Sequence, residues 1–165
     1  MKRIGLFVIS LFVSSAAFAV QPFELRVMNG ETVNETFNSD TYPDGVFVIE
    51  AYFNNCPYCH QNAPKINSLA KKFEGEESVH VLDVSRDCRQ SDYTRWMQRT
   101  NPNHSVLNDC NQAVLGQLAI RGFPTTIVLD CNLTEVYRHV GAMTSSDYTT
   151  LVAKVEQVVA AGCQR

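Results

Sequence analysis

Residues 46–60 read VFVIEAYFNNCPYCH, and this stretch decides the fold. The run from Val46 to Phe53 is rich in Val, Ile and aromatic side chains, which is typical of a buried strand. Beyond Cys59, apolar residues recur at helical spacing, namely Ile66, Leu69, Ala70 and Phe73. The sequence therefore predicts a strand, a turn and a helix that begins at Cys56.

A cysteine at a helix start favours its thiolate form, because the unpaired amide donors and the positive end of the helix dipole face it. We therefore expect Cys56 to be a redox nucleophile and Cys59 to be the resolving thiol. An inert structural disulfide is one alternative. A second is c-type haem attachment, because Cys56-Pro57-Tyr58-Cys59-His60 also fits that signature. The preceding strand and its Glu50 have no role in haem attachment.

The first residues resemble a secretory signal. Lys2 and Arg3 precede an apolar run from Ile4 to Val13, and Ala17-Phe18-Ala19 offers a signal-peptidase site. The alternative is a permanent anchor, but the run is shorter than the roughly 20 residues that span a bilayer. We expect residues 1–19 to be a signal peptide cut after Ala19, with no stable membrane insertion afterwards, and residues 20–165 to be an exported, periplasmic domain.

Composition agrees with one exported domain. The chain has 165 residues, 45% of them hydrophobic, so it can bury one core. Cleavage would leave 165 − 19 = 146 residues, and losing Lys2 and Arg3 would change the formal charge from −3 to −5. We expect a monomer that binds no nucleic acid. All six cysteines lie in the mature part, which suits an oxidising compartment.

Apolar patterns predict the remaining elements. Alternation on either side of Asn29-Gly30 predicts a hairpin of residues 23–27 and 31–33. Residues 79–84 should form a strand parallel to the first, with a polar, irregular insertion over residues 85–108. A short helix near residues 112–118, antiparallel strands over residues 125–129 and 135–140, and a last helix over residues 146–161, capped by Ser145 or Ser146, complete an α/β chain with a mixed sheet flanked by helices.

This order of elements resembles the thioredoxin superfamily. The matching features are the Cys-x-x-Cys after a buried strand, Glu50 six residues ahead of Cys56, Pro64 within the helix, Gly122-Phe123-Pro124-Thr125 and Gly141. The hairpin and the insertion before the Pro124 loop resemble the exported TlpA and ResA branch. The motif Cys-Pro-Tyr-Cys-His-Gln is also similar to TrbB-like proteins.

The resemblance implies a thioredoxin fold and roles for residues around the dithiol. Glu50 would be buried, with a raised pKa, and would exchange a proton with Cys59; alternatively it is solvated at a strand edge. The Phe123–Pro124 bond would be cis, and the adjoining backbone would pair with an extended substrate. Otherwise Pro124 merely begins a strand. The substrate-binding residues would be Pro57, Tyr58, Phe123 and Pro124.

The other four cysteines are expected to form two disulfides. Cys88 with Cys110 would pin the insertion at both ends, although Cys88 could instead be a second exchange-competent thiol. Tracing strand and helix lengths from Pro124 brings Cys163, after the last helix, close to Cys131 in the turn at the opposite end of the sheet. The histidines His80, His104 and His139 have no metal-ligand spacing, so we expect no metal and no cofactor. Tyr93, Trp96 and Met97 are expected to cap the core, and the alternative is that they form a surface for a partner.

These features together predict an exported reductase or isomerase of protein disulfides, served by an upstream redox partner protein. Two alternatives stay open at this level. One is a dithiol oxidase like DsbA, and the other is a non-catalytic thioredoxin-fold module that binds extended peptides.

Overall fold

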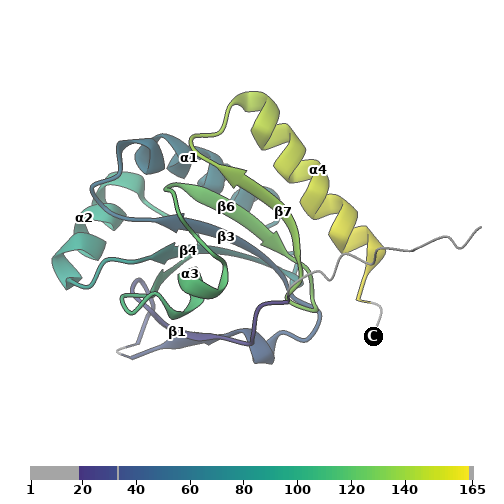
Figure 1. Cartoon of the computed structure of the whole chain (residues 1–165), viewed down its shortest axis with the longest axis horizontal. Coiled ribbons are helices and arrows are strands. Elements are labelled where there is room, and N and C mark those ends of the chain that lie inside the picture. Colours follow the sequence, from purple (N-terminus) through teal and green to yellow (C-terminus); the bar gives the residue numbers. More distant parts are fainter. Residues whose placement is uncertain (1–18, 33, 164–165) are drawn as a thin grey trace, which may run out of the picture.

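The structure, a computed structural model, describes residues 19–32 and 34–163. The expected signal peptide lies outside the described residues except for Ala19. The sheet has the order β2-β1-β5-β4-β3-β6-β7 (Figure 1). Its strands are β1 (Glu24–Val27), β2 (Thr36–Asn38), β3 (Val46–Tyr52), β4 (Val79–Ser85), β5 (Ser105–Asn108), β6 (Thr125–Leu129) and β7 (Glu135–Val140). The helices are the 3-10 turn η1 (Ser39–Thr41), α1 (Pro57–Lys72), α2 (Gln90–Thr100), α3 (Ala113–Gln117) and α4 (Ser145–Ala161).

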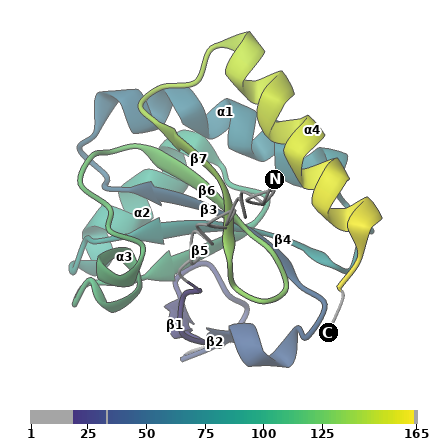
Figure 2. The same cartoon turned by 45° about the vertical axis from the view of Figure 1, so that its right-hand side comes forward.

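Strand β3 lies inside the sheet and all its side chains are buried, because helices cover both faces. On one face Val48 packs with Ile66 of α1 and Leu151 of α4. On the other face Ile49 packs with Leu115 of α3. Helices α1 and α4 therefore lie together on one side and α3 on the opposite side (Figure 2). The parallel β3–β4 pair and the antiparallel β6–β7 pair are as predicted.

The amino-terminal hairpin is present, but its second strand is not where we expected it. Strand β1 pairs with residues 36–38, which lie beyond the expected residues 31–33, so Asn29-Gly30 is not a two-residue turn. The reason is that the Asn29 side chain bonds to the chain around β5, donating to His104 O at 2.8 Å and accepting from Val106 N at 2.8 Å. Val27 N donates a hydrogen bond to Glu35 O at 2.8 Å, and Glu35 lies beyond the expected turn.

The expectation of an irregular segment over residues 85–108 was also wrong. Most of this segment is regular, forming α2 and then β5, which pairs parallel with β4. Trp96 is buried at the centre of α2, as expected of a core residue. The cap of α4 differs as well, because Thr144 forms a capping box with Asp147 in place of Ser145 or Ser146.

The described chain begins at the end of the sheet opposite Cys56. Ala19 forms an isolated bridge with Thr134, and Val20 is buried, with its backbone N–H donating to Leu133 O at 2.9 Å. Among the described residues, no helix combines the length and apolar character required to span a bilayer.

Candidate active site

The cysteine pair lies where β3 ends and α1 begins. Cys56 is the N-cap of α1, and its sulfur accepts a hydrogen bond from Cys59 N at 3.1 Å. Pro57 occupies the first turn, where a missing N–H costs nothing. The two cysteines form a disulfide with their Cα atoms 5.2 Å apart. Cys59 is fully buried, whereas Tyr58 between them is 60% exposed, so the turn presents itself to solvent on the Pro-Tyr side.

Glu50 is buried two residues before the end of β3. Its carboxylate accepts hydrogen bonds from Thr126 Oγ1 at 2.5 Å and Asn62 Nδ2 at 3.1 Å. Burial raises the pKa of Glu50 from 4.5 to about 8, the nearby Asp83 adds to this, and the two hydrogen bonds oppose it. The alternative of a solvated strand-edge carboxylate is therefore wrong. Asn62 follows Cys59 by one turn of α1, so it connects the cysteine helix to Glu50.

Asp83 is a second buried carboxylate that the sequence analysis did not single out. It is the register partner of Glu50 in β4. Trp96 Nε1 donates to its Oδ2 at 2.9 Å, and His104 Nε2 lies 3.1 Å from its Oδ1. The signal was available, because Asp83 interrupts an apolar strand as Glu50 does.

The loop before β6 lies beside the cysteine turn. The Phe123–Pro124 peptide bond is cis, and Thr125 Oγ1 donates to Gly122 O at 2.8 Å. Thr125 is the register partner of Ala51. This register places Pro124 next to the residues that lead from β3 to Cys56. The Phe123 and Phe53 rings meet edge to face with their centroids 5.5 Å apart.

The loop from Phe53 to Cys56 is fixed by hydrogen bonds to the backbone of Asn54. Asp87, after β4, accepts from Asn54 N at 2.6 Å. The His60 ring bonds through Nε2 to Asn54 O at 2.8 Å and lies 4.9 Å from the Trp96 ring. This geometry opposes the haem alternative, because His60 is engaged within the fold and Cys59 is buried. Among the described residues, no group of three or more His, Cys, Asp or Glu side chains is placed to hold a metal ion.

The remaining cysteines form the two expected pairs. Cys88 is joined to Cys110, with Cα atoms 4.9 Å apart, and Cys131 to Cys163, with Cα atoms 6.0 Å apart. Cys88 is exposed and follows β4 at the same sheet edge as Cys56. The Cys131–Cys163 bond ties the β6–β7 turn to the end of α4, at the opposite end of the sheet.

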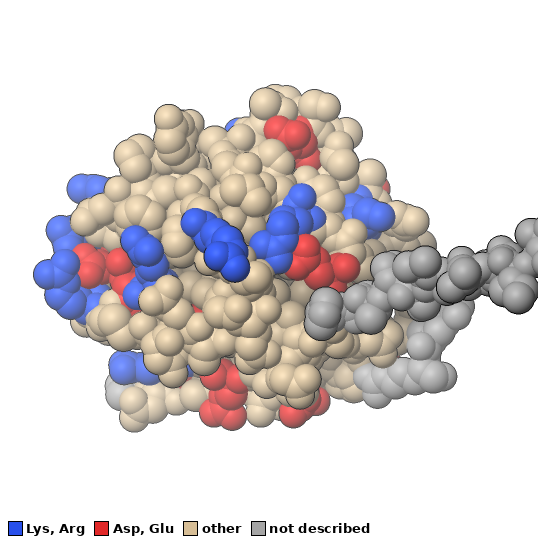
Figure 3. Space-filling view, in the orientation of Figure 1, with Lys and Arg blue, Asp and Glu red and all other residues tan. Residues whose placement is uncertain are grey.

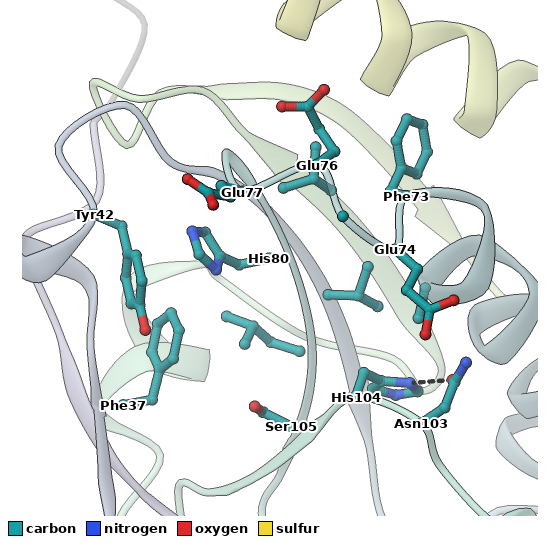
Figure 4. Close-up of a pocket in the computed structure, with 15 residues that line it drawn as sticks. Phe37, Tyr42, Phe73, Glu74, Glu76, Glu77, His80, Asn103, His104 and Ser105 are labelled. Carbon is teal, nitrogen blue, oxygen red and sulfur yellow. Dashed lines mark hydrogen bonds between the residues drawn. The ribbon is translucent and has the colours of Figure 1, made fainter.

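A pocket of about 400 Å³ lies away from the cysteines (Figure 4). It lies against the start of β4 and the residues that follow α1. Since α1 begins directly after Cys56 and has 16 residues, its far end lies about 24 Å from the cysteine turn. Burial lowers the pKa of His80 in this pocket, where Tyr42 packs on the His80 ring at 3.9 Å. The pocket therefore takes no part in the dithiol site.

Comparison with known proteins agrees with the fold. The chain is 28% identical over 169 residues to the thiol:disulfide interchange protein DsbE of Vibrio cholerae, covering 94% of this chain and 89% of that protein. A protein from Chlorobium tepidum, described as a candidate thiol:disulfide interchange protein DsbE, has a similar structure with a TM-score of 0.74 at 18% identity, covering 86% of this chain and 95% of that one. A secreted disulfide oxidoreductase of Mycobacterium tuberculosis, homologous to Escherichia coli DsbE, has a TM-score of 0.65 at 17% identity, covering 82% of this chain and 95% of that one.

The sequence comparison with protein families covers most of the chain. Residues 18–137 match the AhpC/TSA family. This match includes β3, the cysteine turn, Glu50 and the Pro124 loop, which are the parts that build the site. The chain therefore belongs to the AhpC/TSA family, and its fold is thioredoxin-like.

Proposed function

We propose that this chain is an exported thiol-disulfide oxidoreductase that reduces or isomerises protein disulfides through Cys56 and Cys59. The observation that carries the proposal is the placement of Cys56 at the start of α1, with Glu50 buried behind it and bonded to the same helix through Asn62. The first feature favours a thiolate, and the second supplies a proton acceptor whose pKa lies near neutrality.

The proposed reaction begins from the reduced dithiol. The Cys56 thiolate attacks one sulfur of a substrate disulfide, whose S–S bond breaks as the mixed disulfide forms, and the released thiolate takes up a proton. Cys59 gives its proton to Glu50 and attacks the Cys56 sulfur, which releases the second substrate thiol. The substrate gains two electrons, and Cys56 and Cys59 become the disulfide. An upstream dithiol protein must then return two electrons to this bond.

Substrate contact is proposed for four residues beside the cysteines, of which Pro57 and Tyr58 are exposed, Phe123 is half-buried and Pro124 is buried. Pro57 and Tyr58 lie between the cysteines, and Phe123 and Pro124 lie across from them. An extended peptide can add as a strand along the Phe123 backbone with its disulfide over Cys56. The Tyr58 ring is already exposed, so it can pack on the substrate without first leaving contacts inside the protein.

Export is supported by the cysteines and by the start of the domain. All six cysteines are paired in disulfides, which persist in oxidising compartments. Val20, the first residue after the proposed cleavage, already belongs to the core. We therefore propose that residues 1–19 are a signal peptide and residues 20–165 the periplasmic domain, which works as a monomer.

Reduction of insulin by dithiothreitol in the presence of the purified domain tests this function. The wild-type protein should accelerate precipitation of the insulin B chain, and Cys56→Ser should abolish the effect. The double variant Cys131→Ser/Cys163→Ser, altered at the far end of the sheet, is the control and should keep the activity. Inactive wild-type protein, or an active Cys56→Ser variant, would contradict the proposal.

Equilibration with glutathione then separates the reductase from the oxidase. A Cys56–Cys59 potential close to thioredoxin, at about −270 mV, supports a reductase, whereas a value near −120 mV, as in DsbA, supports the oxidase alternative. Peptide binding without any thiol-disulfide exchange would support the alternative of a non-catalytic peptide-binding module.

A further inference from the structure

Arg86 directly follows β4, at the end of the sheet where the cysteines lie, and its guanidinium packs against two phenyl rings. The guanidinium carbon is 4.5 Å from the centroid of Phe53 and 4.8 Å from that of Phe123. A cation at this distance is attracted by the negative faces of the rings. The rings in turn restrict where the long arginine side chain can lie, so the charge is held in one place before any substrate arrives.

This place is next to the cysteines. Arg86 N donates to Tyr52 O at 3.4 Å, and Cys56 N donates to Phe53 O at 3.1 Å, so the backbone that carries Arg86 is tied to the cysteine loop. Phe53 and Phe123 both pack against the apolar cluster that contains Cys56 and Cys59. A peptide that places its disulfide over Cys56 and pairs along the Phe123 backbone therefore passes within side-chain reach of Arg86.

The charge of Arg86 has no partner within the described part of the chain. The side chain is exposed, and none of the ion pairs found there includes it. Two nearby arginines do have a partner, because Arg89 and Arg95 share the carboxylate of Asp92. The adjacent Asp87 accepts from Asn54 N and from Ser85 Oγ, and it forms no ion pair with Arg86 among the described residues.

The surroundings of Arg86 are basic although the chain is acidic overall, with a formal charge of −3. Arg121, two residues before Phe123, is also exposed and has no ion pair among the described residues. On the face seen in Figure 3, Lys and Arg side chains extend from the left across the middle, with some Asp and Glu side chains next to them. A local positive charge on an acidic protein attracts acidic segments and repels basic ones.

We propose that Arg86 is a specificity-determining residue that selects disulfide-bearing segments with an Asp or Glu beside the attacked cysteine. The proposal rests on the proposed function and names its substrate class. The guanidinium offers donors in a planar fork that fits a carboxylate with two hydrogen bonds. The neighbouring rings exclude part of the water, so the ion pair is screened less than a fully exposed one.

A purely structural role is the competing explanation, because an arginine stem also covers apolar rings. The two roles respond differently to substitution. Arg86→Met keeps an unbranched stem over the rings and removes the charge, whereas Arg86→Lys keeps the charge and removes the planar fork. Arg26→Gln is the matched control, because Arg26 is exposed on β1 and its loss changes the net charge equally.

The experiment compares kcat/KM for three peptides with one disulfide and one sequence, except that the residue flanking the attacked cysteine is Glu, Gln or Lys. Wild-type protein should prefer Glu over Gln by about fivefold, and Lys should be the poorest. The preference should disappear in Arg86→Met, decrease in Arg86→Lys, persist in Arg26→Gln, and fall in high salt.

The contradicting outcomes are distinct. Equal rates for all three peptides with wild-type protein would overturn the role of Arg86 and leave the proposed function standing. The same would follow if Arg86→Met kept the preference and lost only thermal stability. Failure of wild-type protein to reduce any of the peptides would overturn the proposed function and the substrate class with it.

Discussion

Glu50 and Asp83 lie opposite each other on the parallel strands β3 and β4, and both are buried, with exposures of 1% and 2%. Two buried carboxylates on neighbouring strands resist being ionised together, because each negative charge disfavours the other. Asp83 is held by Trp96 and His104, while Glu50 receives its hydrogen bonds from Thr126 and Asn62. The proposed proton acceptor is thus adjacent to a second acid that raises its pKa.

Asp83→Asn should lower the pKa of Glu50, because it removes the nearby negative charge and leaves burial unchanged. The pKa should still stay above 4.5, since burial is the larger cause of the increase. Titration of the Glu50 side-chain carboxyl carbon by NMR in both proteins measures the difference. An unchanged or higher pKa in Asp83→Asn would show that the two carboxylates do not interact.

Glu50 should make folding less favourable as the pH rises. Its pKa is raised on folding from 4.5 to about 8, so the folded state binds the proton more tightly, and this contribution to stability is complete below pH 4.5 and lost as the pH rises through 8. The difference corresponds to roughly 5 kcal/mol at most. Glu50→Gln should therefore gain stability relative to wild type between pH 5 and pH 9 in urea unfolding. Parallel curves for the two proteins would refute this.

Glu50→Gln should also slow exchange while leaving the fold intact, because the amide keeps the shape and cannot take a proton from Cys59. We expect turnover to fall by about tenfold or more near pH 7. The resolution step, followed as decay of a preformed mixed disulfide, is the direct measurement, and formation of that mixed disulfide at Cys56 serves as the internal control. Equal decay rates from pH 6 to pH 9 would remove Glu50 from the mechanism.

In the reduced protein, Cys56 should titrate below the ordinary thiol pKa of about 8.5, because the first-turn amides of α1 stabilise its thiolate. Thiolate absorbance against pH measures the value. Iodoacetamide should modify Cys56 faster than the buried Cys59. If Cys59 were the faster of the two, the roles assigned to the two cysteines would have to be exchanged.

Loss of the Cys131–Cys163 disulfide should reduce stability without changing the chemistry. The bond closes a sequence separation of 32 residues, which corresponds to about 3 to 4 kcal/mol in the chain-entropy model. Cys131→Ser/Cys163→Ser should lose about this much in urea unfolding and keep the insulin activity at 25 °C. A tryptic map of the non-reduced wild-type protein that shows both cysteines alkylated would contradict the pairing.

Local apolar patterns predicted the centre of the fold. The spacing of apolar residues was sufficient to tell helix from strand in five elements, namely β3, α1, β4, β6 and β7. The hairpin failed because its geometry depends on Asn29, whose partners lie 75 and 77 residues away in sequence. Helix α2 was missed because it packs through few apolar side chains and is otherwise polar, with Trp96 its largest buried residue.

The site was predicted where one residue contradicts its surroundings. Glu50 stands out as a carboxylate in an apolar strand, and Cys56 as a cysteine at a helix start. Asp83 carries the same contradiction, but its meaning depends on Trp96 and His104, which reach it from α2 and from the residues before β5. Arg86 gave no signal, because its position over Phe53 and Phe123 arises only when three separate segments meet at one edge.

The hydrogen bond from Val20 N to Leu133 O fixes the amino end of the described domain at the β6–β7 turn. The chain enters the fold at the β6–β7 turn, and the cysteines lie at the other end of the same sheet. A domain attached through its amino end, to a bead, a membrane or a fusion partner, therefore turns its dithiol outward to face approaching proteins. Immobilisation through the amino end leaves the catalytic edge accessible, so tethered protein is suited to trapping mixed-disulfide partners from solution.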